Sequence, residues 1–386
     1  MHKWTIAAGI SLITFAAIAD ARGAQTELVH VSSIDLSTQF GADTGYGNNP
    51  LSVAFDGTNA YVGGYNNGGA AANVGVVKVS GLFGGGATFT PLAATQFSAA
   101  NLRGLDALAY DAGAGALFMA YDSGAAATSF ISRRDPVSGA ASWTITNPQA
   151  SRPFAMSIDP SGDGGSPGVG FLVQSSGRRR LLRISDGASV FDGTTGGIIN
   201  TDPTTGTTWR ALEFDSDGNV VVGNQQGYGY GRRVNANQWE ELGGTDNVTE
   251  RSALKDVTLN NVGQGIVIME DLGSDLLALS GRNQTTLTDS LGAVTAAPET
   301  QVHIRNLDGS VTGLTQVSLT GAENGIGTAW LGDTKNLVFG LDASGVGTLL
   351  VLDFDGRRLD VYQVPEPASM GLIGLGAFLL ARRRRC

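Results

Sequence analysis

The chain of 386 residues contains one cysteine and three histidines, and both shortages limit the chemistry it can perform. The cysteine is the last residue, Cys386, so the sequence excludes a disulfide within the chain, a cysteine-based zinc site and a thiol nucleophile inside the body. Beyond the N-terminal segment only His30 and His303 remain for histidine catalysis, and their spacing does not suggest a shared metal. The stability of the body therefore depends on the burial of apolar side chains.

Nucleotide-binding motifs are also missing. The sequence has 56 glycines but no G-x-G-x-x-G, no Gly-Lys pair of the kind a P-loop needs, and no H-E-x-x-H. One G-x-S-x-G pattern runs from Gly164 to Gly168, as in a nucleophile elbow. Its serine is followed by Pro167, which has no N–H to contribute to an oxyanion hole. We therefore predict a hairpin turn here rather than a catalytic serine.

Positive charge is scarce. Charged residues make up 16% of the chain, and the formal net charge is −10. A nucleic-acid-binding protein needs a basic face to neutralise phosphates, so this balance argues against nucleic acid as a partner. The basic cluster inside the body, Arg178–Arg180, is interpreted as a solvated strand edge that discourages edge-to-edge pairing.

The N-terminus has the parts of a secretory signal peptide. A lysine supplies positive charge, residues 5–19 form an apolar run, and Ala19 and Ala21 flank Asp20 as a small-x-small cleavage site. The run is shorter than the ~20 residues that a membrane-spanning helix needs. We therefore predict that residues 1–21 are a signal peptide that is removed after export.

Three features follow one another at the C-terminus. A stiff Pro-Glu-Pro segment comes first, residues 368–381 are an unbroken apolar stretch, and a block of four arginines ends the pattern. The arginines favour the cytoplasmic side while the apolar stretch enters the bilayer as a short transmembrane helix, lengthened by arginine side chains that reach the interface. The residues that carry the pattern are Pro365, Glu366, Pro367, Arg382, Arg383, Arg384 and Arg385.

This tail, residues 363–386, resembles the PEP-CTERM sorting signal. The resemblance implies handling by a membrane transpeptidase of the exosortase type, with cleavage near the PEP motif. It implies an exported protein that passes through an inner-membrane intermediate with the help of the export machinery. Its destination would be the cell surface, the outer envelope or the extracellular matrix, often in an exopolysaccharide context.

The body between the two ends, residues 22–362, contains similar segments that each consist of an apolar strand, a turn rich in Asp, Asn or Gly, and a second apolar strand. More polar hairpins lie between them, so the repeating unit has about 50 residues and four strands. The residues that precede the predicted turns of the apolar pairs are Phe55, Tyr110, Ile158, Phe214, Leu259 and Leu331.

This pattern is typical of a β-propeller, because a lone four-stranded sheet cannot bury both faces whereas blades around an axis bury one another. We predict an all-β fold with six blades, and the long interval between Leu259 and Leu331 leaves room for a seventh. The strand that begins at Glu27 is expected to close the ring by pairing with the last blade. The body resembles propellers with YVTN- or NHL-type blades, and a β-sandwich or a β-helix is the alternative.

Carboxylates near the predicted inner strands form the candidate binding site. A propeller brings such side chains together at one end of its axis, where an acidic mouth could bind a cation or protonate a glycosidic oxygen. The candidates are Asp106, Glu213, Asp256, Glu270 and Asp271.

Two further segments are candidate ligand sites. Asp215 and Asp217 begin a sequence like the start of a calcium loop, but its twelfth position lacks the bidentate Glu of a complete loop, and the same residues make a good β-turn. Apart from Ca²⁺ at this turn, no cofactor is expected. Tyr228 and Tyr230 lie in the sequence 227–231, which is expected to be an exposed aromatic loop that could stack on sugars.

Two functions remain open at this point. The first is a non-enzymatic envelope or matrix protein whose propeller binds a polysaccharide, a cation or another protein. The second is an exported hydrolase or lyase that acts on polysaccharide through carboxylates at the propeller mouth. The second predicts that at least two carboxylates converge within roughly 10 Å, the range that glycosidases use.

Overall fold

The computed structural model describes most of the body of the chain. Residues 1–27, which include the predicted signal peptide, and residues 365–386, which include most of the predicted sorting tail, lie outside the described residues. Within the part of the chain that is described, no helix is long and apolar enough to cross a membrane. The described residues are 28–41, 44–69, 71–99, 103–125, 127–146, 153–173, 178–194, 209–224, 227–235, 238–241, 265–270, 276–280, 287–288, 294–295, 301–306, 317–318, 337–354 and 356–364.

The described chain is built of antiparallel strands, which confirms the all-β prediction. Most strands belong to four-stranded units whose strands pair in chain order. The units are β2 (Asn49–Phe55), β3 (Ala60–Asn66), β5 (Val76–Ser80) and β6 (Thr88–Pro91); β8 (Arg103–Asp111), β9 (Ala116–Tyr121), β10 (Phe130–Arg134) and β11 (Ala141–Thr146); β12 (Pro153–Asp163), β13 (Ser166–Val173), β14 (Arg178–Arg183) and β15 (Ser189–Thr194); β16 (Trp209–Phe214), β17 (Val220–Asn224), β18 (Gly227–Asn235) and β19 (Gln238–Glu241); β20 (Gly265–Met269), β21 (Leu276–Ser280), β24 (Gln301–Asn306) and β25 (Val317–Ser318); and β26 (Leu337–Leu341), β27 (Gly347–Asp353) and β28 (Arg358–Gln363) with β1 (Val29–Asp35).

Two of the units share a sheet, and a few short elements lie outside the four-stranded units. The first and second units join into one eight-stranded sheet, because the end of β3 pairs with the start of β8. The remaining elements are the strand pair β4 (Asn73–Val74) with β7 (Phe97–Ser98), the strand pair β22 (Leu287–Thr288) with β23 (Val294–Thr295), and the 3-10 helix η2 (Ala93–Thr95).

Aspartates form the turns between the first and second strands. In the first unit the Asp56 carboxylate accepts hydrogen bonds from the N–H groups of Thr58 (2.8 Å) and Asn59 (2.6 Å). Gly57 has φ of 89°, a left-handed conformation that glycine adopts without steric cost. Asp342 accepts N–H groups in the same way in the last unit. These local bonds explain why Asp and Gly predict the turns.

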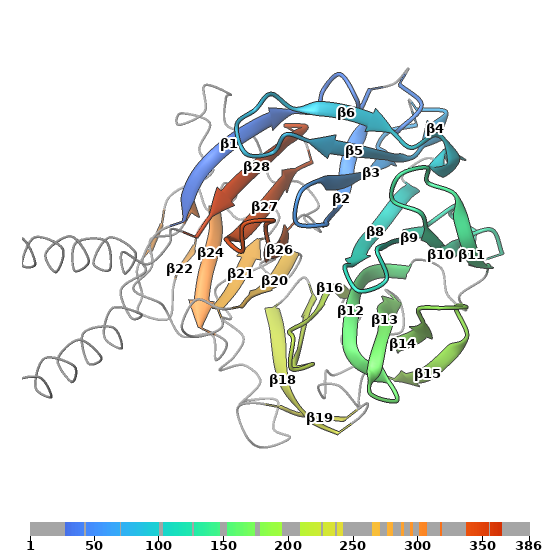
Figure 1. Ribbon diagram of the computed structural model, residues 1–386, viewed down its shortest axis with the longest axis vertical. Helices are drawn as coiled ribbons and strands as arrows, with labels where there is room; N and C mark the ends of the chain where they lie inside the picture. The colour runs from blue at the N-terminus through green and yellow to red at the C-terminus, as the bar shows by residue number, and fades with distance from the viewer. Residues whose placement is uncertain are drawn as a thin grey trace, which may run out of the picture.

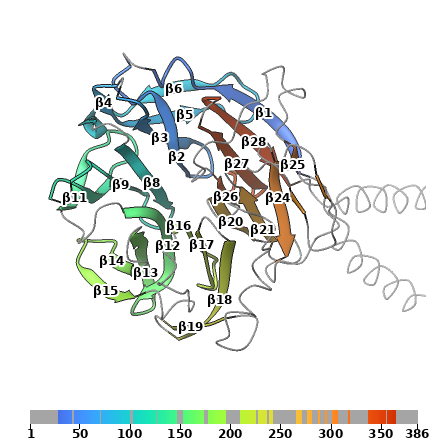
Figure 2. The same ribbon diagram turned by 180° about the vertical axis from the view of Figure 1, so that it is seen from behind.

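The first strand of each unit lies towards a common centre (Figure 1). These inner strands contact one another in the order β2, β8, β12, β16, β20 and β26, and β26 in turn contacts β2. Figure 2 shows the same arrangement from behind, with β6, β11, β15 and β19 at the periphery. The body is therefore propeller-like, with each sheet packed against its neighbours.

The two ends of the described chain meet in the last sheet, whose order is β1-β28-β27-β26. β1 pairs antiparallel with β28, from Val29 opposite Gln363 to Asp35 opposite Arg358. This confirms the prediction that the strand starting near Glu27 pairs with the last unit. Because β1 comes first and β28 last in the body, this sheet cannot be completed until almost the whole chain is present.

Apolar side chains fill the interfaces between neighbouring units. Phe55 of the first unit packs in one cluster with Leu350 of the last unit. Phe118 of the second unit packs in another with Phe171 of the third. Burying a large apolar side chain stabilises the fold by about 1.5–3 kcal/mol, so these interfaces hold the ring of sheets together.

A β-bulge recurs at the same place in the inner strands β2, β8, β12 and β16. In each of these strands one extra residue interrupts the pairing with the second strand. It lies four positions before the last residue ahead of the turn, which is Phe55, Tyr110, Ile158 or Phe214. A bulge redirects the side chain of the extra residue. The bulged residues are Leu51, Asp106, Phe154 and Arg210.

The prediction that two apolar hairpins turn after Leu259 and Leu331 is wrong, because it assigns their strands one place too late in the unit. The segment 265–269 was expected to be the second strand of its hairpin, but it is the inner strand β20 and pairs with β21. Likewise 337–341 is the inner strand β26 and pairs with β27. First and second strands are both buried and apolar, so hydrophobicity does not tell them apart. Leu259 and Leu331 themselves lie outside the described residues.

Candidate functional site

A cavity of about 210 Å³ lies between the inner strands at the centre of the body. All the inner strands contribute to its wall, and most of the residues that line it have apolar side chains. Within the described part of the chain, no lysine, arginine or histidine lines it. The wall residues with polar side chains are Asp106, Tyr110, Ser157 and Glu213. A cavity lined by apolar residues with a small number of polar side chains is typical of a small-molecule site.

Glu213 is a wall residue whose pKa is strongly changed by its surroundings. Its carboxyl group is hydrogen-bonded to the Ser157 hydroxyl of β12, and the Ser157 oxygen also accepts the N–H of Phe214 at 3.2 Å. Burial raises the pKa of Glu213 to about 8; the charges of Glu270 and Asp215 add to the rise, whereas the Ser157 hydrogen bond opposes it. At pH 7 this carboxyl is therefore mostly protonated and can donate a hydrogen bond.

Asp106 also lines this cavity, and a β-bulge places it there. It is the bulged residue of β8 and is fully buried. The equivalent bulges of the other units hold Leu51, Phe154 and Arg210, so the carboxylate belongs to the second unit alone among these four. Two of the predicted carboxylates, Asp106 and Glu213, thus line one cavity.

Glu270, another of the predicted carboxylates, is not among the residues that line this wall. Glu270 follows β20 and accepts the backbone N–H of Ser216, which links the fifth unit to the fourth. Asp256 and Asp271 lie outside the described residues.

Ser157 is a site residue that the sequence patterns do not single out. It directly precedes Ile158, as Glu213 directly precedes Phe214, so the two occupy equivalent positions in successive units. Aligning the repeats on the residue before the turn would have placed the hydroxyl and the carboxyl in one layer. The hydrogen bond between them forms only because β12 and β16 are adjacent.

Asp215 takes part in its own turn. Its carboxylate accepts hydrogen bonds from the N–H and the side-chain amide of Asn219, both at 2.7 Å. Burial raises the pKa of Asp215, and the bonds to Asn219 oppose that rise. Asp217 is exposed on the same turn. The described residues hold no group of three or more His, Cys, Asp or Glu placed for a metal ion, and calcium at Asp215 and Asp217 stays a prediction.

The segment 227–231 is a strand, so the expectation of an exposed loop is wrong. Tyr228 pairs with Gly223 and Tyr230 with Val221 across β17 and β18. Alternation of Gly and Tyr suits the pleat of a strand, and β17 supplies the hydrogen-bonding partners that the sequence alone does not show. Sugar binding by the two tyrosines stays a prediction.

The G-x-S-x-G segment forms a hairpin turn, as predicted. Gly164 and Gly165 have φ of 61° and 94°, and Asp163 pairs with Ser166 on either side of them. Positive φ at two consecutive residues explains the glycine pair. The serine begins β13 rather than a helix, so no nucleophile elbow is formed.

The interpretation of Arg178–Arg180 as a strand edge is wrong. These residues begin β14, which pairs with β13 on one side and β15 on the other. Arg180 is buried. The polar hairpin that follows supplies the fourth strand of the unit and covers this edge, which the charge pattern alone does not reveal.

A serine, a histidine and an aspartate meet in the closing sheet without the geometry of a catalytic triad. His30 Nε2 is 2.9 Å from Ser33 Oγ, and Ser33 Oγ donates to Asp360 at 2.5 Å. A triad needs the carboxylate on the other ring nitrogen, whereas here Asp360 lies 4.0 Å from the same Nε2. The buried Arg358 Nε binds Asp360 at 2.8 Å. The cluster ties β1 to β28.

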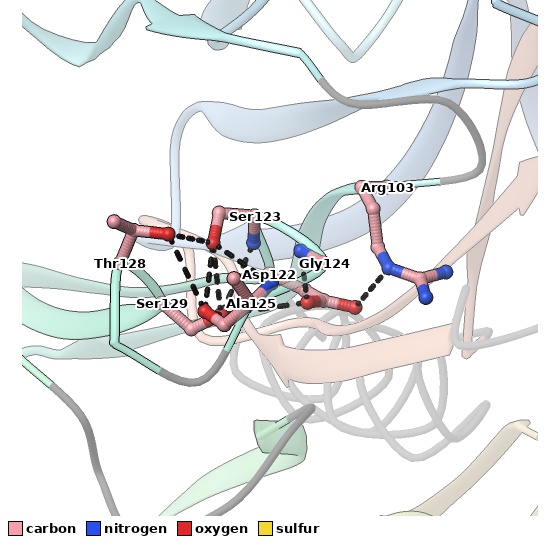
Figure 3. Close-up of polar contacts among 7 residues, drawn as sticks. All are labelled: Arg103, Asp122, Ser123, Gly124, Ala125, Thr128 and Ser129. Atoms are coloured by element: carbon pink, nitrogen blue, oxygen red, sulfur yellow. Dashed lines mark hydrogen bonds and ion pairs between the residues drawn. The ribbon is translucent and has the colours of Figure 1, made fainter.

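A second polar network fixes the loop that follows β9 (Figure 3). Asp122 forms an ion pair with Arg103 Nε at 3.2 Å and accepts the N–H of Gly124 at 2.8 Å. All the contacts drawn join residues of one unit, so we assign the network to shaping the loop. Its other members are Ser123, Ala125, Thr128 and Ser129.

Comparison with known families concerns the tail. Residues 363–385 match the PEP-CTERM protein-sorting motif. The identification of this segment as a PEP-CTERM sorting signal is therefore confirmed, and the motif implies export, sorting to the envelope or surface, and processing by exosortase-type machinery. A comparison with curated proteins finds no match.

Several solved structures are similar to the body in fold. Virginiamycin B lyase from Staphylococcus aureus is 13% identical, with 86% of this chain and 99% of that chain covered and a TM-score of 0.47. An auxiliary nutrient binding protein from Bacteroides thetaiotaomicron is 11% identical, with 83% and 70% covered and a TM-score of 0.45. YCF48 bound to D1 peptide is 11% identical, with 87% and 95% covered and a TM-score of 0.39.

Proposed function

We propose that the protein is an exported envelope or matrix protein whose body is a closed six-bladed β-propeller that binds a small ligand without catalysis. The observation that carries the sorting part is the match of residues 363–385 to the PEP-CTERM motif. Six blades are supported by the ring of contacts among the inner strands. Direct contact between β20 and β26 argues against a seventh blade between them.

The binding part rests on the central cavity. Its wall carries two carboxyl groups, Asp106 and Glu213, and a hydroxyl, Ser157, but no basic side chain in the described residues. Such a wall attracts a cation or a neutral polar molecule and repels an anion. A volume of about 210 Å³ equals that of about seven water molecules in the liquid, so the cavity suits a small molecule rather than a polymer.

Cell fractionation tests the sorting part. The native protein is expected at the cell surface or in the matrix with both ends removed, whereas a variant with Arg382–Arg385 replaced by alanine is expected to stay in the cell membrane. A native protein that keeps its tail and stays in the inner membrane would show that the tail is a plain anchor.

Calorimetry tests the binding part with a series of primary alkylamines and neutral monosaccharides as probes. We expect saturable binding by one of these classes, weakened at least tenfold in Glu213→Ala, which removes the hydrogen-bonding carboxyl. Binding should be unchanged in the control Asp186→Asn, which removes an exposed carboxylate of the neighbouring unit. If no probe binds, or if both variants behave alike, the cavity is not the ligand site.

The second candidate function is cleavage of a polysaccharide, either by hydrolysis or by the elimination that a lyase catalyses. One observation favours it: the cavity wall combines a carboxyl that is mostly protonated at neutral pH with a second acidic side chain, the pairing that acid–base catalysis uses. Turnover of a glycan panel that is abolished in both Glu213→Gln and Asp106→Asn would support it. Absence of turnover across the panel would leave the binding function.

A further inference from the structure

One layer of the central cavity combines small side chains with a glutamate. In each of the first four units, the residue directly before the last residue ahead of the turn lines the cavity. In three of these units it is an alanine or a serine, which leaves space in front of the glutamate of the fourth unit. Glu213 is accordingly half-buried although it lies inside the body. The four residues of the layer are Ala54, Ala109, Ser157 and Glu213.

The hydrogen bond to Ser157 decides which side of the Glu213 carboxyl can meet a ligand. The Ser157 oxygen accepts the N–H of Phe214 at 3.2 Å, so its own hydrogen is available to Glu213. This hydrogen bond opposes the rise in the pKa of Glu213, as expected when the serine donates and the carboxyl accepts. One carboxyl oxygen therefore serves as an acceptor, and the proton that Glu213 carries lies on the other oxygen.

The strands that pack against β16 bring no unpaired positive charge to Glu213. These strands are β12, β13, β17 and β20. Among them β12 carries the titratable side chains, Asp159 and Asp163. Asp159 forms an ion pair with Arg233, and Asp163 forms one with Arg183 at 3.1 Å. The basic side chains nearest to these strands in the described chain are thus already bonded to aspartates.

The remaining charges near Glu213 are acidic. Burial raises the pKa of Glu213 to about 8, and the charges of Glu270, which follows β20, and of Asp215 in its own unit add to the rise. Asp106 and Tyr110 of β8 are the other titratable groups among the described wall residues. At neutral pH a ligand therefore meets Glu213 as a hydroxyl that donates a hydrogen bond rather than as a negative charge.

We propose that the ligand of the central cavity is an uncharged molecule whose oxygen accepts a hydrogen bond from the protonated Glu213, and that ionisation of this carboxyl releases the ligand. An ionised carboxylate offers acceptors alone, so it cannot donate to the ligand oxygen and repels it. Polyols and neutral sugars belong to this chemical class. The inference rests on the proposed binding function and adds the class of the ligand and its control by pH.

Calorimetry at two pH values tests the inference on protein purified from its own cells. The probes are neutral monosaccharides and primary alkylamines, each titrated at about pH 6 and about pH 9. With a pKa of about 8, about a tenth of Glu213 is still protonated at pH 9. The affinity of wild type for a monosaccharide should therefore fall about tenfold between the two pH values.

Variants of Glu213 show which group causes the fall. Glu213→Gln keeps a donor and an acceptor but cannot ionise, so its affinity should be the same at both pH values and higher than that of Glu213→Ala. The control Asp186→Asn removes an exposed carboxylate and should show the wild-type dependence on pH. Circular dichroism at both pH values verifies that each protein is folded.

The outcomes separate this inference from the proposed function. If neither class of probe binds, or if Glu213→Ala binds like wild type, both are overturned. If alkylamines bind more tightly than monosaccharides at pH 6, or if Glu213→Gln shows the same dependence on pH as wild type, this inference alone is overturned. A monosaccharide affinity that falls about tenfold in wild type and stays constant in Glu213→Gln supports both.

Discussion

Replacing Glu213 by glutamine should change how the stability of the body depends on pH. In the folded chain the pKa of Glu213 is raised from 4.5 to about 8, because burial disfavours the charged form. The folded state then binds the proton more tightly than the unfolded state does. The contribution to stability is fully present below pH 4.5 and is lost as the pH rises through about 8.

The size of this effect follows from the pKa values. A tenfold change in proton affinity corresponds to about 1.4 kcal/mol, so the rise from 4.5 to about 8 corresponds to about 5 kcal/mol. Water that enters the cavity would solvate the ionised carboxylate, so we expect a measured loss of about 2–5 kcal/mol between pH 5 and pH 9.5. For a body the size of residues 22–362, this corresponds to a decrease in Tm of about 3–7 °C.

Thermal unfolding by circular dichroism, measured across this pH range, gives the assay. Glu213→Gln cannot titrate, so its Tm should fall less than that of wild type by the amount just given. Asp217→Asn removes an exposed carboxylate and should follow the wild-type curve. The reasoning would be refuted if wild type and Glu213→Gln lost stability in parallel, because Glu213 would then ionise as readily in the folded body as in the unfolded chain.

Three further predictions concern the packing and closure of the body. Gly64→Ala should prevent folding or make the body strongly unstable, because the added Cβ would overlap the backbone carbonyl of Tyr46. Gly85→Ala places its Cβ in open space and should change the Tm little. Circular dichroism of the two purified variants tests this. Arg358→Met leaves the buried Asp360 without its cation and should lower the free energy of unfolding, measured in urea, by about 3–5 kcal/mol. A decrease of less than about 1 kcal/mol would show that Asp360 does not need this ion pair. Deletion of residues 29–35 should expose β28 to limited proteolysis, and an unchanged digestion pattern would mean that β1 does not close the ring.

The sequence predicts the elements whose causes are local. The turn at Asp56 depends on side-chain bonds to the next few residues, so its composition is enough to locate it. The sorting tail is also local, because proline stiffness, apolar length and arginine charge are properties of neighbouring residues. The pairing of β1 with β28 could be predicted as well, since a ring of repeats needs one strand from the other end of the chain to close it.

Other features depend on contacts between segments that are distant in the sequence. The hairpins around Leu259 and Leu331 are wrong by one strand because the first and second strands of a unit have the same apolar character. Arg178–Arg180 lies in the interior of a sheet only because β15 covers β14. The segment that contains Tyr228 and Tyr230 is a strand because β17 supplies partners for it.

The candidate site shows the same division. The sequence by itself determined that acidic side chains lie near the inner strands, that the body is all-β, and that the tail directs sorting, because each follows from residue type and short-range order. Only the tertiary structure decided that Asp106 and Glu213 line one cavity and that Ser157 binds the Glu213 carboxyl. The physical reason is that a strand neighbour and a desolvated carboxyl depend on which sheets pack together. That packing is decided by contacts between inner strands that are distant in the sequence rather than by any single segment.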